Sequence, residues 1–271
     1  MVLGLIIAVA LGCFIVERLF PANDLPKVRA WWARIILINL IQLGIVILAG
    51  ITWDKWFQSY SLFKLSNYLN PIWAGVIAYI VSTFIYYWWH RYRHESRFFW
   101  RLCHQIHHSP RRIEILTSFY KHPVEITINS LLSSAIVYIL LGCSIEAAAI
   151  YTFLIAIAEF FYHWNIKTPY WVGTIIQRPE SHRIHHKYRF HTKNFADLPL
   201  WDWLFGTYEN AKVTPARCGF DDWREDRFDD MLAFRDIHAK GIESISPLHL
   251  LPTCIGCSKR WACSQSRGVI K

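Results

Sequence analysis

The sequence predicts an all-α fold, a multi-pass membrane helical bundle of about four or five membrane helices with a cytoplasmic histidine-rich helical cap. Three observations support this fold class. Of the 271 residues, 54% are apolar and only 18% are charged, against about 45–50% and about 25% in ordinary soluble chains. The apolar residues gather in five runs that approach or reach the length of a bilayer-spanning helix. Eleven of the 13 histidines fall between His90 and His191.

The composition also excludes other classes of protein. The 44 aromatic residues (14 Trp, 13 Tyr, 17 Phe) supply enough apolar surface to rule out a disordered chain. The seven cysteines are odd in number, and Cys13 and Cys143 lie inside apolar runs, so a disulfide-rich secreted domain is not expected.

The N-terminal part is expected to form two membrane helices. The first apolar run, residues 2–16, is closed by Glu17 and Arg18. It does not resemble a secretory signal, because no positive charge precedes it and no small-residue cleavage site follows it. The second run, residues 35–51, contains no charged residue, which is typical of a bilayer-spanning helix.

Three further runs complete the predicted bundle. Residues 72–89 end in a cluster of tyrosine and tryptophan that suits the headgroup region of a membrane. Residues 126–143 and 145–162 are separated by almost nothing, so we expect a tight helical hairpin that enters and leaves on one face. Glu146 and Glu159 are the only charged residues in this pair.

The basic residues predict the orientation of the bundle. Of the 29 lysines and arginines, 27 fall in residues 18–34, 90–125 and 163–271, which this topology places on one side. The positive-inside rule makes that side cytoplasmic. The net charge of +9 is then explained by topology and anionic lipid headgroups, and no nucleic-acid partner is expected, because the sequence contains no RNA- or DNA-binding motif.

Histidines gather in three spaced groups where the chain leaves the predicted membrane. HRYRH places two histidines four residues apart, and HQIHH and HRIHH each place three at i, i+3 and i+4. On a helix this spacing brings two or three imidazoles to one face. The eight residues are His90, His94, His104, His107, His108, His182, His185 and His186. A single such motif could arise by chance, but three on one side of a membrane predict a metal site.

Five histidines lie outside these motifs. His163 follows the last predicted membrane helix and returns to the same face, so we expect it to be a ligand. His122, just before Pro123, is a ligand, a hydrogen-bond donor to a ligand or a turn anchor. His191 is less favoured as a ligand, and His238 and His249 are not expected to bind metal.

The type and number of ligands indicate which metals fit. Imidazole suits iron, zinc, copper and nickel, whereas magnesium and calcium prefer oxygen. Eight or nine histidines exceed what one tetrahedral zinc uses, so two metal ions are implied. The Glu-x-x-His pairs of carboxylate di-iron bundles and the HExxH motif of zinc proteases are both absent.

Carboxylates are expected near the metals, because neutral imidazoles leave the charge of two cations uncompensated. Glu95 directly follows the first motif. Glu159 lies one turn before His163 near the end of a predicted membrane helix, where a charge is costly unless it is paired. Asp202, in LWDWLFGTY, is the third candidate.

These motifs resemble those of the fatty acid hydroxylase and sterol desaturase superfamily. The resemblance covers roughly residues 75–210 and includes HWNIKTPYWVG, RPESHRIHH and LWDWLFGTY. It implies an integral membrane, non-haem di-iron oxygenase that uses O2 and two electrons to hydroxylate or desaturate a lipid. It further implies that the eight motif histidines and His163 bind two iron ions, which zinc could replace in a purified form, and that Glu95 takes the place of a glutamate seen in some members.

The resemblance also divides the chain. Residues 1–71 are expected to form two N-terminal membrane helices and loops, residues 72–210 a catalytic domain, and residues 211–271 a C-terminal cytoplasmic tail. The sequence has no GxGxxG loop and no fused haem domain, so electrons are expected from an external haem or iron–sulfur protein with its reductase. Cys254, Cys257, Cys263 and His249 could form a zinc site in the tail, although free thiols are favoured.

A membrane metal transporter or metal-binding sensor is the alternative function. A transporter is expected to place polar ligands near the middle of the bilayer. Here the histidines gather at one predicted surface and the apolar runs are nearly free of ionisable groups. The oxygenase interpretation is therefore favoured.

Overall fold

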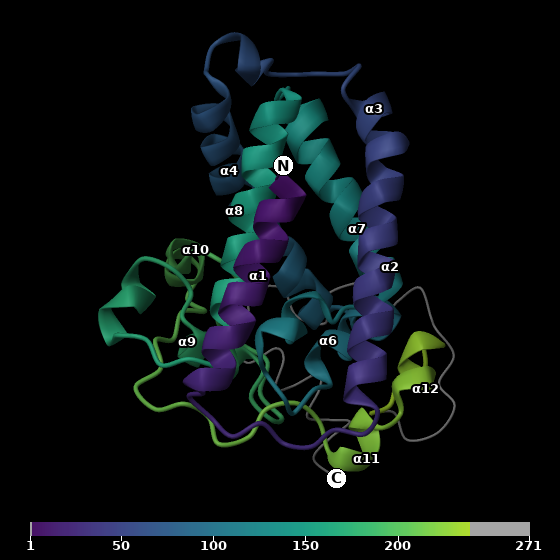
Figure 1. Ribbon diagram of the computed structural model, residues 1–271, viewed down its shortest axis with the longest axis vertical. Helices are drawn as coiled ribbons and strands as arrows, with labels where there is room; N and C mark the ends of the chain where they lie inside the picture. Colours follow the sequence, from purple (N-terminus) through teal and green to yellow (C-terminus); the bar gives the residue numbers. More distant parts are fainter. Residues whose placement is uncertain (1, 239–271) are drawn as a thin grey trace.

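A computed structural model describes residues 2–238, and within that part of the chain the structure is all helical (Figure 1). Five helices are long and apolar enough to cross a membrane, as the sequence predicts. They are α1 (Val2–Leu19), α2 (Trp31–Ile51) with its extension α3 (Trp53–Phe57), α4 (Pro71–Glu95), α7 (Pro123–Ser134) continuing into the π-helical η4 (Ala135–Leu140), and α8 (Ile145–His163).

The helices begin where the sequence provides capping residues. The side chain of Asn70 accepts a hydrogen bond from the backbone N–H of Trp73, and Pro71 opens α4. Ser144 caps α8 in the same way through the N–H of Ala147. The hairpin between η4 and α8 is tight, as predicted, and turns at Gly142, whose positive φ favours glycine.

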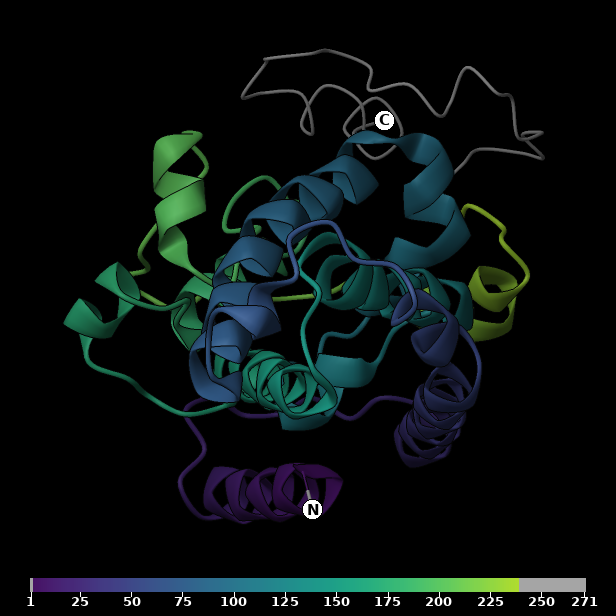
Figure 2. The same cartoon turned by 90° about the horizontal axis from the view of Figure 1, so that it is seen from above.

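The centre of the bundle is the contact between α4 and α8. At Gly75 a β-carbon would lie 2.7 Å from the backbone oxygen of Ala147, so the close approach of the two helices requires glycine at this position. Helices α1 and α2 lie at the edge of the bundle in Figure 2. Their outward leucines and isoleucines, such as Leu11 and Leu40, are exposed, which is typical of a lipid-facing surface.

Short helices form a cap at one end of the bundle, the lower end in Figure 1. They are α5 (Arg97–Phe99), the π-helical η2 (Trp100–His104), α6 (Gln105–His108), η3 (Ile115–Phe119), η5 (Tyr170–Thr174), α9 (Pro179–His185), α10 (Pro199–Leu204), α11 (Asp222–Glu225) and α12 (Phe228–Leu232). The fully buried Glu17 ties α1 to this cap, because its carboxylate accepts the backbone N–H of Ile115 at 2.9 Å and of Asn165 at 2.8 Å.

The helix boundaries extend the sequence predictions at several ends. Helix α4 continues past the predicted aromatic boundary to Glu95, so HRYRH is helical throughout. Helix α2 begins at Trp31, four residues before the predicted run. The predicted zinc site with Cys254, Cys257, Cys263 and His249 lies outside the described residues.

Candidate metal centre

The three histidine motifs lie on different elements of the cap. His90 and His94 are one turn apart on the last two turns of α4. HQIHH spans the end of η2 and the short helix α6, and HRIHH covers the end of α9 and its C-cap residue, His186. His163 is the last residue of α8. All nine predicted ligands therefore approach the same region from the ends of helices.

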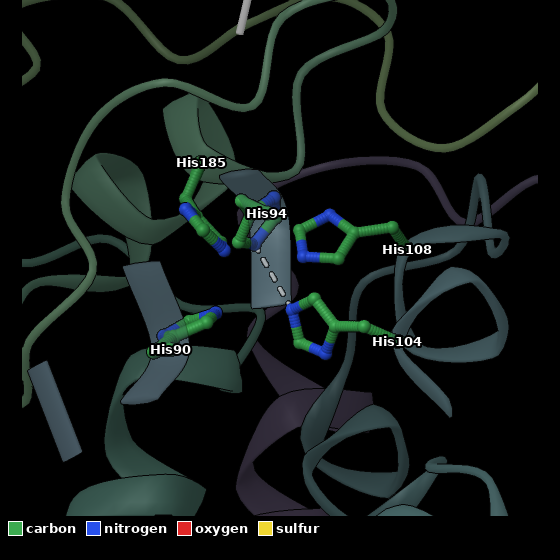
Figure 3. Close-up of side chains that lie close together, drawn as sticks. All are labelled: His90, His94, His104, His108 and His185. Atoms are coloured by element: carbon green, nitrogen blue, oxygen red, sulfur yellow. Dashed lines mark hydrogen bonds between the residues drawn. The ribbon is translucent and has the colours of Figure 1, made fainter. Parts of the chain in front are cut away.

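The nine histidines form two groups, and in each group the available nitrogen atoms lie within 4.8 Å of one another. One group of five is shown in Figure 3 and consists of His90, His94, His104, His108 and His185. The second group, of four, consists of His107, His163, His182 and His186. Eight of these residues are buried, and His90 is half-buried. The arrangement offers two sites for metal ions, next to each other.

The two HxxHH motifs contribute to both groups. In HQIHH, His104 and His108 belong to the five-histidine group, whereas His107 belongs to the other. In HRIHH the division is reversed, since His185 joins the five-histidine group, whereas His182 and His186 join the four-histidine group. Each motif thus keeps its i, i+4 pair together and sends the remaining histidine to the neighbouring site.

The ring nitrogens converge as metal ligands do. The Nε2 atoms of His94 and His104 lie 2.9 Å apart, and the Nε2 of His182 lies 3.2 Å from that of His163 and 3.1 Å from that of His186. A neutral imidazole has one N–H donor, so one Nε2 atom can donate to only one of two neighbours. A cation between the rings satisfies all of these lone pairs together, and the donor set fits a metal.

The opposite ring nitrogens face oxygen atoms. The Nδ1 contacts are to the backbone oxygen of Phe195 for His90 (2.7 Å), of Tyr120 for His107 (3.3 Å), of Glu159 for His163 (2.9 Å) and of Lys193 for His185 (2.8 Å), and to the Glu125 carboxylate for His104 (3.1 Å). An Nδ1–H donor to oxygen fixes the tautomer that leaves Nε2 free to bind metal. The orientation of five of the nine rings is set in this way.

Burial keeps the imidazoles neutral. It lowers the pKa of His104, His107, His108, His182 and His186 well below the usual value, and that of His185 to about 3. Neighbouring histidines act in the same direction, because two adjacent imidazolium charges repel each other. Since metal binding requires the unprotonated ring, the site is ready to bind a cation near neutral pH.

A buried carboxylate that the sequence analysis missed supports the five-histidine group. Glu125, in the first turn of α7, is fully buried, forms an ion pair with Arg93 and accepts a hydrogen bond from His104. Its position two residues after Pro123, at the predicted membrane boundary, was the available signal. A charge at such a position is costly unless it is paired or part of a site.

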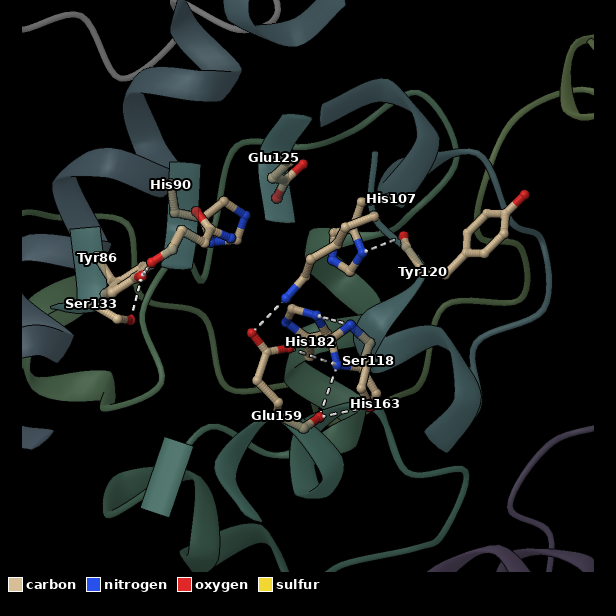
Figure 4. A network of polar contacts seen from close by, with 12 residues as sticks. Tyr86, His90, His107, Ser118, Tyr120, Glu125, Ser133, Glu159, His163 and His182 are labelled. Atoms are coloured by element: carbon tan, nitrogen blue, oxygen red, sulfur yellow. Dashed lines mark hydrogen bonds and ion pairs between the residues drawn. The ribbon is translucent and has the colours of Figure 1, made fainter. Parts of the chain in front are cut away.

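Glu159 lies beside the four-histidine group (Figure 4). Its carboxylate accepts a hydrogen bond from Lys121 at 2.6 Å and lies 3.8 Å from the Nδ1 atom of His163. Its backbone oxygen is the acceptor for the same histidine nitrogen. Glu159 therefore combines a salt bridge with the orientation of a predicted ligand.

Asp202 acts on His90 through the backbone. Its buried carboxylate accepts the N–H of Phe195 at 2.8 Å and of Ala196 at 2.9 Å, together with the hydroxyl of Thr207 at 2.7 Å. These bonds hold the loop whose Phe195 carbonyl accepts the Nδ1–H of His90. Burial raises the pKa of Asp202 to about 6, so the group is mostly ionised at neutral pH.

Neither histidine group includes the other two candidates, Glu95 and His122. Glu95 forms an ion pair with Arg91, one turn earlier on α4. His122 caps α7, because its Nδ1 accepts the backbone N–H of Val124 at 3.0 Å. His191, which the sequence analysis favoured less, lies with its ring centre 4.7 Å from that of His108 and belongs to neither group.

A cavity of about 250 Å³ opens beside both histidine groups. Histidines from each group line it, including His90, His104, His107 and His182, and it extends between α2, α4, α7 and α8 into the membrane part of the bundle. Asp197, whose pKa burial raises to about 7, also lines it and was not predicted from the sequence.

Comparisons with known proteins agree with this geometry. Alkylglycerol monooxygenase of Homo sapiens is 30% identical over 173 residues, which are 58% of this chain and 35% of that protein. Sphingolipid C4-hydroxylase sur2 of Schizosaccharomyces pombe is 25% identical over 150 residues, 54% of this chain and 51% of the relative. Very-long-chain aldehyde decarbonylase GL1-5 of Oryza sativa subsp. indica is 28% identical over 214 residues, 74% and 32% of the two chains.

The chain spans about a third to a half of the length of these relatives. No solved structure matches it significantly. The sequence model of the fatty acid hydroxylase family matches residues 75–207, a range that contains all nine clustered histidines, Glu125, Glu159 and Asp202. Residues 75–207 are therefore similar in sequence to the fatty acid hydroxylase family.

Proposed function

We propose that this protein is a membrane-bound non-haem di-iron oxygenase that uses O2 and external electrons to hydroxylate or desaturate a lipid. The observation that carries the proposal is the division of nine histidines, eight of them buried, into two adjacent groups beside a cavity in the membrane bundle. Nine imidazoles, five of them oriented by an oxygen atom, suit two iron ions, and zinc is expected to replace iron in some preparations. The catalytic unit is residues 72–210.

The chain's own residues bind the metals, orient them and exclude water. Bound iron supplies the redox chemistry with O2 that oxidises an unactivated C–H bond. Imidazole nitrogens of the two groups would hold the ions, and the Nδ1–H contacts to backbone oxygens and to Glu125 fix five of the rings. Burial of the histidines keeps bulk water away from the site, so that the lipid is oxidised rather than the surroundings.

The substrate is a lipid that reaches the cavity from the bilayer. By their names, the relatives act on alkylglycerols, sphingolipids or very-long-chain aldehydes. The cavity lies between helices that are long and apolar enough to cross a membrane, which supports entry of a lipid from the bilayer. The distribution of lysine and arginine supports a cytoplasmic location for the histidine cap, where we expect a haem or iron–sulfur protein with its reductase to supply the electrons.

The test is to purify the protein after expression with iron, measure the metal bound per chain, and follow oxidation of co-purified or added lipids by mass spectrometry. We expect oxidised product that depends on O2 and on a reductant. The control variant is His122→Gln, which lies outside both histidine groups and is expected to retain iron and activity. An iron-loaded protein that oxidises none of the lipid classes named by the relatives, in cells or after purification, would argue against the oxygenase.

A further inference from the structure

The cavity beside the histidines has a polar wall although it lies among membrane helices. Tyr86, Asn129 and Ser133 line it at a level between the histidines and the middle of the bundle. Polar side chains inside a membrane bundle are costly unless they are paired or serve a site. A hydrocarbon chain offers these polar groups no hydrogen-bond partner, so it does not explain why they line the cavity.

Two helices carry this polar wall in register with the metal centre. On α4, Tyr86 lies one turn before His90. On α7, Asn129 and Ser133 follow Glu125, the partner of His104, at intervals of one turn. One turn of α-helix rises ~5.4 Å, so Tyr86 lies about that far along α4 from His90, and Asn129 lies about that far along α7 from Glu125.

Hydrogen bonds fix the hydroxyl groups of the wall (Figure 4). The hydroxyl of Tyr151 donates to Ser133 at 2.9 Å, and that of Tyr86 donates to the backbone oxygen of Asn129 at 2.7 Å. Ser133 therefore donates to Tyr86 at 2.9 Å. Each hydroxyl proton in this chain of bonds is used, and the side chains are held in place before a ligand arrives.

The side-chain NH2 group of Asn129 is the hydrogen-bond donor that the polar wall offers to a ligand. The indole N–H of Trp89, which can only donate, bonds to Oδ1 of Asn129 at 2.9 Å. This bond determines which way the amide faces and directs its NH2 group away from Trp89. Among the described residues, no hydrogen-bond acceptor is found for that NH2 group, and Asn129 lines the cavity.

We propose that Asn129, supported by Tyr86 and Ser133, binds an oxygen atom of the substrate, so that the oxidised lipid carries a hydroxyl, ether or carbonyl oxygen a few bonds from the carbon that reacts. This inference rests on the proposed function and specifies its substrate class. The size of the cavity agrees with it, because about 250 Å³ holds the reacting segment of a lipid and is smaller than the ~300–1,000 Å³ typical of pockets that enclose a whole ligand.

Binding can be tested without turnover. The iron-loaded protein is photolabelled, without O2, by an octadecanol that carries a diazirine, and octadecan-1-ol, octadecyl methyl ether and octadecane compete for the label at equal concentrations. Mass spectrometry measures adducts on peptides that contain cavity residues. We expect the alcohol and the ether to compete about tenfold better than the alkane, as expected for one net hydrogen bond. If only the alcohol or only the ether competes better than the alkane, the result identifies whether the subsite binds a hydroxyl or an ether oxygen.

The substitution Asn129→Leu should bring the alcohol and ether close to the alkane, with alkane competition retained. Tyr86→Phe, which keeps the ring, should reduce the preference more weakly. Asn39→Leu is the matched control, since Asn39 lies on α2 outside the cavity lining and bonds to the backbone of its own helix. It should leave the preference unchanged.

Two outcomes would overturn the subsite. Equal competition by all three compounds in the wild type would mean that the polar wall holds water only. An unchanged preference in Asn129→Leu would assign recognition to other residues. Because the assay needs no oxidation, it tests this inference separately from the proposed function. A protein that binds iron and prefers the alcohol and ether to the alkane, but oxidises no lipid, would have the subsite without the proposed activity.

Discussion

The Nε2 atoms of His94 and His104 lie 2.9 Å apart although the two residues come from the end of α4 and from the separate π-helical segment η2 (Figure 3). Neither ring is held there by its own helix alone. His104 is oriented by Glu125 on α7, so three elements meet at this contact. The juxtaposition of two imidazole lone pairs in a buried site favours a shared cation.

Removing one of these rings should weaken one site and spare the other. In His94→Ala we expect the metal content to fall from about two ions per chain towards one, because the five-histidine group loses the ring that faces His104 whereas the four-histidine group keeps all its ligands. Elemental analysis of the purified variant measures this. His122→Gln should retain both ions. Full metal content in His94→Ala would show that His94 is dispensable as a ligand.

Replacement of the carboxylate behind His104 should weaken metal binding without removing a ligand. Glu125→Gln leaves Arg93 without its counter-ion and weakens the acceptor that orients the ring. We expect a loss of about 10–100-fold in metal affinity, the usual effect of losing such a partner. Titration with a competing chelator gives the affinity. Glu95→Gln, whose carboxylate pairs with Arg91, is the matched control and should bind metal normally.

Asp202 should contribute mainly to stability. Its carboxylate is fully buried and accepts hydrogen bonds from two backbone N–H groups and from Thr207. Asp202→Ala should lower the free energy of unfolding by about 2–4 kcal/mol, because it leaves these donors unpaired. Thermal unfolding in detergent measures the change.

The largely exposed Asp222 provides a control for this effect. Asp222→Ala should unfold at nearly the wild-type temperature, whereas Asp202→Asn should lose less stability than Asp202→Ala. If Asp202→Ala unfolds like the wild type, the loop that positions His90 does not depend on this carboxylate.

The metal-free protein should lose stability as the pH falls. Burial lowers the pKa of the clustered histidines in the cap, that of His185 to about 3, while an unfolded histidine titrates near 6.5. Between these values the unfolded chain binds more protons, so stability is full above about pH 6.5 and declines below it. Asp197 and Asp202, whose pKa values are raised to about 7 and about 6, oppose this trend but are fewer.

The measurement is the unfolding temperature of the metal-free protein between pH 8 and pH 5. We expect a steady decrease below about pH 6.5 and a smaller decrease when metal is bound, because the bound ion competes with protons for the rings. An unfolding temperature that rises as the pH falls would contradict the burial of neutral histidines in the metal-free fold.

Much of the fold was predictable because membrane helices have a strong sequence signal. Long apolar runs such as residues 35–51 can be satisfied only by helices in a bilayer, so α2 follows from composition. The clustering of the histidines was predictable for a related reason, since spacing on a helix fixes which histidines share a face. His163 was found from its position after the last apolar run.

The division of the ligands between two sites was not predictable. His107 and His108 are adjacent in sequence yet belong to different groups, which depends on how α6 and α9 pack against each other. Glu125 was missed for a similar reason, because its role is set by contact with Arg93 and His104 from other elements. Local patterns identify ligand types, whereas tertiary packing assigns them to sites.

The central claim is that two adjacent histidine groups bind two iron ions. The most direct test is the metal content of the iron-loaded wild type together with His94→Ala and His182→Ala, one variant for each group. The proposed function predicts about two irons per chain in the wild type and a count close to one in each variant. One iron or fewer in the wild type, or complete loss of iron in both single variants, would contradict two independently assembled sites.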